Sequence, residues 1–225
     1  MSELSKKFYS KWSFFYSLVF ENPPVIRGIR KEAVQSLELD EGDTVVELGC
    51  GTGANLRYMR DQVGSKGKII GIDISPGMLE KAKKKKRKNE WENVELIEAD
   101  ASSIELEEEL DAVLTSFSIC MFDEPEKVIE KWNKKLDGGR FTNLVISRSD
   151  RDTLLPVNFF VDIFEILTAP TSFKEGLKKS LPERHEKCQK TARQKLEAVS
   201  HNFKEKEFVL GIIKYYSGSL SRKAF

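Results

Sequence analysis

The chain has 225 residues, of which 40% are hydrophobic and 32% are charged. This composition is typical of a globular protein, and the length allows one sizeable domain with appended helices. The 37 Lys and Arg residues nearly balance the 36 Asp and Glu residues, so the formal net charge is +1. That balance excludes a uniformly basic surface for nucleic acid, but it leaves local charged patches open.

The three cysteines, Cys50, Cys120 and Cys188, are far apart in the sequence and form no CxxC pair. This spacing argues against a disulfide framework and against a metal site, so we expect no bound metal. The sparse, odd number of cysteines favours a reducing compartment. The apolar stretch Phe14–Phe20 is too short to span a bilayer and lacks a signal-peptide pattern, so we expect a cytoplasmic protein.

The N-terminal part of the chain is expected to form two helices. The aromatic-rich segment Leu4–Phe20 has apolar residues on one helical face, which predicts an amphipathic helix. Asn22-Pro23-Pro24 ends it, and a second helix is expected over Val25–Leu37. The aromatic face either docks into the core or forms a lid that excludes water from a ligand. Candidate substrate contacts in this segment are Tyr9, Trp12 and Tyr16.

From Thr44 onward, expected strands and helices alternate. The strands are Thr44–Leu48, Lys68–Asp73, Asn93–Ile97, Ala112–Thr115 and Phe141–Ser147. The helices between them are Ala54–Val63, a helix from Pro76 with Ser75 as N-cap, and Pro125–Leu136. Alternation at this spacing is typical of right-handed βαβ units, so we predict an α/β fold with a doubly wound, mostly parallel sheet and helices on both faces. Further along, helices are expected at Val157–Leu167 and Glu183–Val199, and a final strand at Phe208–Tyr216.

The strongest functional signal is the segment Glu47-Leu48-Gly49-Cys50-Gly51-Thr52-Gly53-Ala54 after the first strand. Glycines there allow a tight turn and close approach of a ligand to the next helix N-terminus. The pattern also satisfies a dinucleotide fingerprint. However, the charge of Glu47 would oppose a pyrophosphate, and the sequence contains no Tyr-x-x-x-Lys pair for hydride transfer. A phosphate-free ligand with a cationic amino-acid portion fits better.

Two further acids follow the second and third expected strands. Asp73 ends one strand beside the glycine loop, where a carboxylate can accept both hydroxyls of a ribose. Asp100 follows the next strand and could accept a hydrogen bond from an exocyclic amine, while Ile74, Met78 and Ala101 could supply apolar faces around a purine. Three acids at three successive strand ends form a more specific pattern than the glycine motif alone.

Together these motifs resemble the class I S-adenosylmethionine-dependent methyltransferases, which have a Rossmann-like fold. The resemblance covers about residues 30–147, including Val45–Gly53, Gly71–Ser75, Glu98–Ala101, Phe117–Phe122 and Leu136–Arg140. It implies S-adenosylmethionine as cofactor, with Gly49, Gly51 and Gly53 near the methionine part, Glu47 supporting its ammonium group and Asp73 on the ribose. The implied cofactor-binding residues are Glu47, Gly49, Cys50, Gly51, Gly53, Asp73, Ile74, Met78, Asp100, Ala101, Ser116 and Phe117. No catalytic side chain is assigned.

Within this superfamily the chain resembles the branch of ubiquinone/menaquinone-biosynthesis and phospholipid methyltransferases. Serine replaces aspartate in both Tyr-Asp pairs that the lid of that branch carries. The resemblance implies a lid over residues 1–38, a methyltransferase domain over 39–225 with a variable helical region at about 150–205, and a small, lipophilic acceptor. We expect a small-molecule or lipid substrate and no nucleic acid, and we leave peripheral membrane contact open.

Two alternatives remain. The basic run Lys81–Lys88 could bind an anionic partner, as in an RNA- or protein-modifying methyltransferase, or it could be a solvated helix end that complements the helix dipole. The chain could also be a non-catalytic S-adenosylmethionine-binding module. Thr115–Cys120 lacks the Asn/Asp-Pro-Pro-aromatic motif of many enzymes that methylate exocyclic amines of bases or glutamine amides, which disfavours those substrates.

Overall fold

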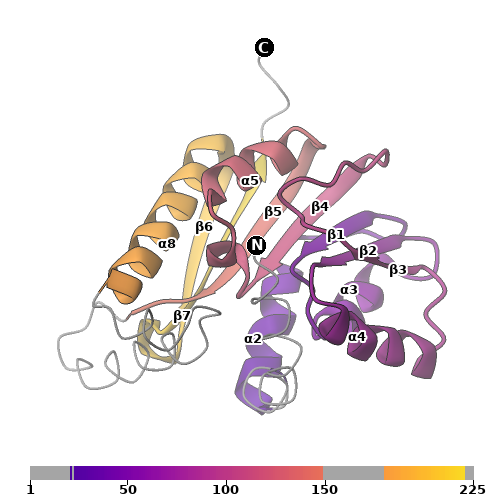
Figure 1. Ribbon diagram of the computed structural model, residues 1–225. Helices are drawn as coiled ribbons and strands as arrows, with labels where there is room; N and C mark the ends of the chain where they lie inside the picture. Colours follow the sequence, from indigo (N-terminus) through magenta and orange to yellow (C-terminus); the bar gives the residue numbers. More distant parts are fainter. Residues whose placement is uncertain (1–20, 22, 149–179, 221–225) are drawn as a thin grey trace.

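The computed structural model describes residue 21 and residues 23–148 and 180–220. Over these residues the chain forms a seven-stranded sheet in the order β3-β2-β1-β4-β5-β7-β6, flanked by helices (Figure 1). The strands are β1 (Thr44–Leu48), β2 (Lys68–Asp73), β3 (Val94–Glu98), β4 (Leu110–Ser116), β5 (Leu136–Ile146), β6 (Ser200–Phe208) and β7 (Ile213–Leu220). The helices are α2 (Pro24–Gln35), α3 (Leu56–Val63), α4 (Pro76–Lys88), α5 (Pro125–Asn133) and α8 (Ser180–Val199), with short 3-10 turns η1 (Ile119–Met121) and η3 (Val209–Gly211).

The sheet is parallel from β3 to β5, and β7 runs antiparallel to both of its neighbours. This arrangement confirms the predicted doubly wound, mostly parallel α/β sheet. The chain leaves β1 toward β2 and β3 on one side, and later adds β4 and β5 on the other. The order therefore reverses between β1 and β4, which is where ligands bind in open α/β sheets.

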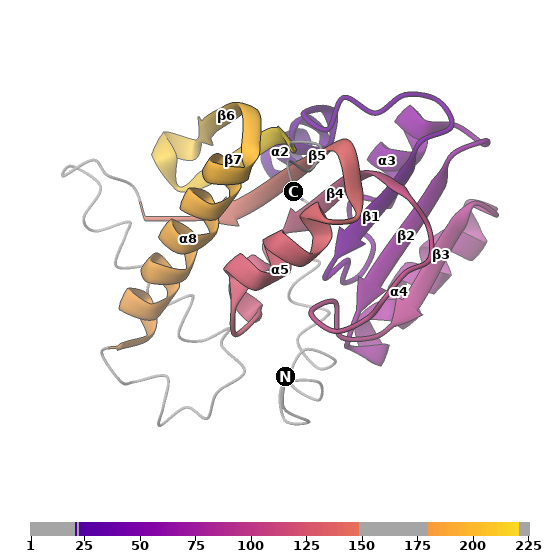
Figure 2. The same ribbon diagram turned by 90° about the horizontal axis from the view of Figure 1, so that it is seen from above.

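Side chains of the central strands alternate between two apolar layers, because successive residues of a strand point to opposite faces. Val46, Ile70 and Val113 pack in the layer that includes Trp132 of α5 and Leu196 of α8. Their neighbours Val45, Ile69 and Ala112 pack on the other face with residues of α2, α3 and α4. Figure 2 shows α5 and α8 on the side of the sheet opposite α2 and α3.

Most of the observed elements match the predicted ones closely. The bounds of β1 and β2 are those expected, and α2, α3, α5, β3, β4 and α8 differ from prediction by a few residues at their ends. Ser75 is the N-cap of α4, although its side chain makes no capping hydrogen bond. The helices expected at Leu4–Phe20 and Val157–Leu167 lie outside the described residues. No helix in the described ranges is both long and apolar enough to cross a membrane.

The single final strand expected at Phe208–Tyr216 is wrong. Phe208 ends β6, η3 turns the chain, and β7 continues to Leu220. The sequence of β6, SHNFKEKEF, is mostly exposed and contains four charged residues, because β6 is an edge strand of the sheet. Charged side chains are common on edge strands, where they oppose pairing with another chain. The apolar pattern expected of a buried strand is therefore absent from β6.

Candidate functional site

The glycine loop after β1 folds back against the end of β2. The backbone N–H groups of Gly49 and Cys50 both donate to the carbonyl oxygen of Ile72, at 2.8 and 3.0 Å. Gly49 and Gly51 have φ values of 70° and 55°, in the left-handed region that favours glycine. A Cβ on Gly49 would lie 2.6 Å from the Cβ of Ser118, whereas a Cβ on Gly51 would meet nothing within 4 Å. Gly51 therefore presents bare backbone to open space, as close approach of a ligand requires.

Asp73 closes the loop from the end of β2. Its Oδ2 accepts a hydrogen bond from the N–H of Gly51, and its Oδ1 accepts one from the N–H of Ser75, both at 2.8 Å. Burial raises the pKa of Asp73 above its ordinary value, and the backbone hydrogen bonds from Ser75 and Gly51 oppose that rise. Each carboxylate oxygen keeps a second acceptor position. The side chain is therefore fixed in orientation and still able to accept two hydroxyl groups.

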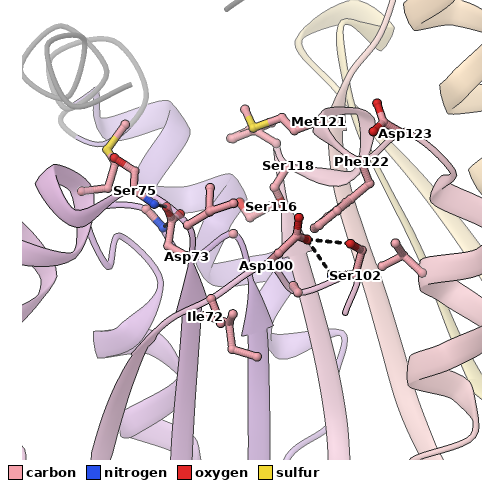
Figure 3. A pocket seen from close by; sticks show the side chains of 18 of the residues that line it. Ile72, Asp73, Ser75, Asp100, Ser102, Ser116, Ser118, Met121, Phe122 and Asp123 are labelled. Carbon is pink, nitrogen blue, oxygen red and sulfur yellow. Dashed lines mark hydrogen bonds between the residues drawn. The ribbon is translucent and has the colours of Figure 1, made fainter. Parts of the chain in front are cut away.

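Asp100 lies beyond the end of β3 and is oriented by Ser102. Its Oδ1 accepts from the N–H of Ser102 at 2.9 Å and from the hydroxyl of Ser102 at 2.6 Å, as Figure 3 shows. Burial raises the pKa of Asp100, but the hydrogen bonds from Ser102 lower it, and the net pKa lies below its ordinary value. Asp100 is thus an ionised acceptor at neutral pH, as recognition of an exocyclic amine requires.

These residues line a cavity of about 330 Å³ at the carboxyl ends of β1, β2 and β4, a volume within the range of small-molecule sites. Figure 3 shows Asp73 and Ser75 on one side of this cavity and Phe122 and Asp123 on the other. Of the residues predicted to bind a cofactor, the cavity brings together Gly49, Gly51, Asp73, Ile74, Met78, Asp100, Ala101, Ser116 and Phe117.

Three residues predicted to bind a cofactor do not line the cavity. Gly53 faces α3, where a Cβ would lie 2.5 Å from the Cδ1 of Leu56. Cys50 is buried, and burial raises the pKa of its thiol well above the ordinary value, so the thiol stays protonated. Glu47 is also buried, beneath the glycine loop. The candidate substrate contacts Tyr9, Trp12 and Tyr16 lie outside the described residues.

The buried carboxylate of Glu47 is only partly satisfied by the protein. Asn55 donates from Nδ2 to Oε1 of Glu47 at 2.5 Å, while Oε2 has no hydrogen-bond partner among the described residues. The pKa of Glu47 is raised to about 7, because burial and, to a smaller extent, the charge of Asp73 outweigh the lowering by the Asn55 hydrogen bond and the charge of Arg30. A buried carboxylate oxygen without a partner is uncommon. Glu47 does not itself line the cavity, but its negative charge favours a cationic group on a ligand there, so the site fits a cofactor with a cationic amino-acid portion.

The sequence did not reveal Arg30 and Asn55 as parts of the site. The side chain of Arg30 is 2% exposed, and its Nη1 donates to Oδ1 of Asn55 at 3.1 Å and to Oγ of Ser116 at 2.8 Å. Arg30 shares the buried face of α2 with Ile29 and Ala33. A charged residue on an otherwise apolar helix face was the signal that could have identified it.

The sequence also predicted only part of the mouth of the cavity, which is formed by the residues after β4. Ser118 donates from Oγ to the carbonyl oxygen of Leu48 at 2.7 Å, which joins the turn after β4 to the end of β1. The turn η1 and the start of α5 then supply the remaining lining, namely Met121, Phe122, Asp123, Glu124, Lys127 and Val128. Only the stretch up to Phe122 carried a signal in the sequence.

The argument from cysteine spacing against a disulfide framework misses one cross-link, because the structure joins Cys120 of η1 to Cys188 of α8. The two Cα atoms are 5.8 Å apart, within the range that a disulfide spans. Sixty-eight residues separate the two cysteines in the sequence, so only the packing of η1 against α8 brings them together. Cys50 remains a free, buried thiol.

Comparisons with known proteins identify relatives of this chain. A family model described as a methyltransferase domain matches residues 39–208. Aklanonic acid methyltransferase DauC of Streptomyces sp. (strain C5) is 34% identical over 122 residues, which are 52% of this chain and 55% of that protein. Demethylmenaquinone methyltransferase of Oceanobacillus iheyensis is 29% identical over 133 residues, which are 58% of this chain and 55% of that protein. The chain thus spans about half the length of these curated relatives.

Among solved structures, an S-adenosylmethionine-dependent methyltransferase from Aquifex aeolicus superposes with a TM-score of 0.62 at 18% identity. The match covers 96% of this chain and 98% of the other. At this level of identity the likeness concerns the fold.

Proposed function

Because the chain belongs to the class I S-adenosylmethionine-dependent methyltransferases, we propose that it transfers a methyl group to a small, lipophilic acceptor. The family resemblance inferred from the glycine loop and the strand-end acids is confirmed. The observation that carries the proposal is the cavity at the reversal of strand order, with Asp73 locked by Gly51 and Ser75 at its edge. When bound, S-adenosylmethionine supplies a methyl group on a sulfonium that is already an activated electrophile.

The chain's own residues would hold the cofactor by three acidic groups. Asp73 would accept hydrogen bonds from the ribose hydroxyls, and Asp100 would accept one from the adenine amine. Glu47 would lie toward the ammonium group of the methionine portion, where its negative charge favours a cation. Met78 and Ala101 would cover the faces of the purine. This assignment requires no phosphate-binding group, in keeping with the acidic character of the strand ends.

The proposal of a lipophilic acceptor rests on the apolar and aromatic side chains at the mouth of the cavity. Phe117, Met121 and Phe122 line the cavity, and Figure 3 shows Phe122 across the cavity from Asp73. Apolar walls exclude water from the reacting atoms, and in-line positioning could then supply most of the catalysis. The relatives named for aklanonic acid and demethylmenaquinone also favour a small organic acceptor. We assign no general base.

We also propose that, within the N-terminal region 1–38, the aromatic segment that precedes α2 acts as a lid on a methyltransferase domain over 39–225, while α2 itself packs on the sheet. An aromatic helix that closes over the cofactor would complete the apolar acceptor site, with Tyr9, Trp12 and Tyr16 as its contacts. Deletion of the aromatic segment should then raise KM for the acceptor while S-adenosylhomocysteine still binds.

Isothermal titration calorimetry tests cofactor binding directly. The unaltered chain should bind S-adenosylmethionine and S-adenosylhomocysteine, and Asp73→Asn should weaken both by about tenfold or more, since it removes the charge that accepts the ribose hydroxyls. Asp61→Asn is the matched control, because Asp61 is exposed on α3, away from the cavity lining. The absence of binding at millimolar cofactor would overturn the proposal.

A transfer assay with cofactor labelled in the methyl group then identifies the acceptor class. We expect label in a lipid or small-molecule fraction of a cell extract. Label in RNA or protein instead would overturn the choice of acceptor but retain the activity. Cofactor binding without transfer to any fraction would indicate a binding module.

A further inference from the structure

Arg30 places a buried cation against several parts of the site at once. It lies on α2, which is far in sequence from the strand ends, and its side chain is 2% exposed. Its Nη1 donates to Asn55 and to Ser116, and its guanidinium carbon lies 4.9 Å from the centre of the Phe117 ring. Buried charges are retained only where partners compensate the loss of water. These contacts therefore fix Arg30 and the groups it touches relative to one another.

On one side, Arg30 sets the orientation of the Asn55 amide. A guanidinium can only donate, so the amide must turn its Oδ1 toward Arg30. The Nδ2 group then points toward Glu47 and donates to its Oε1. In the opposite orientation the amide oxygen would face the carboxylate, which repels it. Arg30 thus acts through Asn55 on the carboxylate proposed to face the methionine portion of the cofactor.

On the other side, Arg30 supports the turn after β4. Phe117 has a φ of 56°, a left-handed conformation that a bulky residue rarely adopts without external support. The N–H of Phe117 donates to the carbonyl oxygen of Leu144 at 2.7 Å, while the guanidinium of Arg30 lies over its ring. Ser116 and Phe117 both line the cavity. Strained backbone at a ligand site is typically held by such surrounding contacts.

We propose that Arg30 is a positioning residue that links α2 to both ends of the cofactor site, through Asn55 to Glu47 and directly to Ser116 and Phe117. This inference rests on the proposed function, since it assumes that the cavity takes S-adenosylmethionine. It assigns to α2 a role in binding, although α2 supplies none of the residues that line the cavity.

The charge of Arg30 gives this role a pH signature. Several groups face the Glu47 carboxylate, namely Arg30 from α2, Asn55 at the start of α3, Asp73 from β2, Lys85 from α4 and the Cys50 thiol. Arg30 and Lys85 favour the ionised form of Glu47, whereas Asp73 opposes it. Loss of the Arg30 charge should raise the pKa of Glu47, so a higher pH would be needed to ionise it. As pH is lowered, Glu47 takes up a proton and affinity for a ligand ammonium group is lost. Without the Arg30 charge, this loss should begin at a higher pH than in the unaltered chain.

The test measures binding of S-adenosylhomocysteine and of methylthioadenosine, which lacks the amino-acid portion, by calorimetry between pH 6 and 9. Arg30→Met should weaken S-adenosylhomocysteine by about tenfold at pH 7 and shift the midpoint of its pH profile upward. Methylthioadenosine should lose far less affinity. Arg30→Lys keeps the charge without the fork geometry, so it should restore the midpoint and only part of the affinity.

Arg27→Met is the matched control, because Arg27 is exposed one turn earlier on the same helix. Equal affinity and an equal pH midpoint in Arg30→Met and the unaltered chain would overturn the positioning role but retain the proposed function. Failure of the unaltered chain to bind either ligand would overturn the proposed function itself. If Arg30→Met does not fold, Arg30→Lys is the deciding variant. An S-adenosylhomocysteine affinity equal to that of the unaltered chain would then overturn the positioning of Asn55 and Ser116 by the guanidinium.

Discussion

The disulfide between Cys120 and Cys188 joins η1, at the mouth of the cavity, to α8, and the cost of losing it can be worked out. The two cysteines are separated by 68 residues. A cross-link over a loop of that length lowers the entropy of the unfolded chain and predicts a stabilisation of about 4 kcal/mol. For a chain of this size each kcal/mol shifts Tm by about 2–4 °C. Reduction should therefore lower Tm by roughly 10 °C.

Scanning calorimetry with and without a phosphine reductant measures this change. Cys188→Ser is the control, because its Tm should match that of the reduced wild-type chain and should not respond to the reductant. A thiol titration of the denatured chain should find only Cys50 before reduction and all three cysteines after it. Three reactive thiols without reductant would refute the cross-link. An intact disulfide whose reduction leaves Tm unchanged would refute the entropy argument.

Two further predictions concern the glycine loop and the acid beneath it. The pKa of Glu47 is raised from 4.5 to about 7 in the folded chain. Between these two pH values the folded chain holds a proton that the unfolded chain has released, so the stability that this proton provides is lost as pH rises from 4.5 to about 7. The free energy of unfolding should fall by roughly 3 kcal/mol between these pH values, and urea titrations of Glu47→Gln should lack this component. Gly49→Ala should destabilise by about 1–3 kcal/mol, since its Cβ would meet that of Ser118 in a left-handed backbone. Gly28→Ala, in open space on α2, should instead stabilise by about 0.5–1 kcal/mol; equal urea midpoints for the two alanine variants would contradict the steric argument.

The central strands could be predicted because their environment leaves a direct trace in the sequence. A parallel strand covered by helices on both faces is a continuous apolar run, and Thr44–Leu48 and Lys68–Asp73 have that pattern. β6 has no such trace, because it lies at the edge and is paired only with β7. Lys204 and Glu205 on β6 form ion pairs with Glu38 and Arg193. Such contacts depend on tertiary structure and leave no period in the sequence.

The candidate site likewise contains residues that the sequence could predict and residues that depend on tertiary packing. Asp73 and Asp100 could be placed in advance, since topology alone brings the carboxyl ends of parallel strands to one edge. Arg30 could not, because its contact with Ser116 spans 86 residues and depends on how α2 packs. The disulfide is a similar case, since cysteine spacing carries no information about the packing of η1 against α8.

The residues that determine the acceptor are not the strand-end residues. The strand-end residues would contact the cofactor, which every member of the family shares, so they carry little information about what is methylated. The groups that face away from Asp73 belong to η1 and the start of α5, where Lys127 pairs with Glu124 at 2.5 Å beside Met121 and Phe122. An exposed ion pair contributes little to stability, so substitutions of Lys127 and Glu124 should leave the fold intact. Substitutions at this mouth should therefore change KM for the acceptor with little effect on cofactor affinity, whereas substitutions at Asp73 should do the reverse.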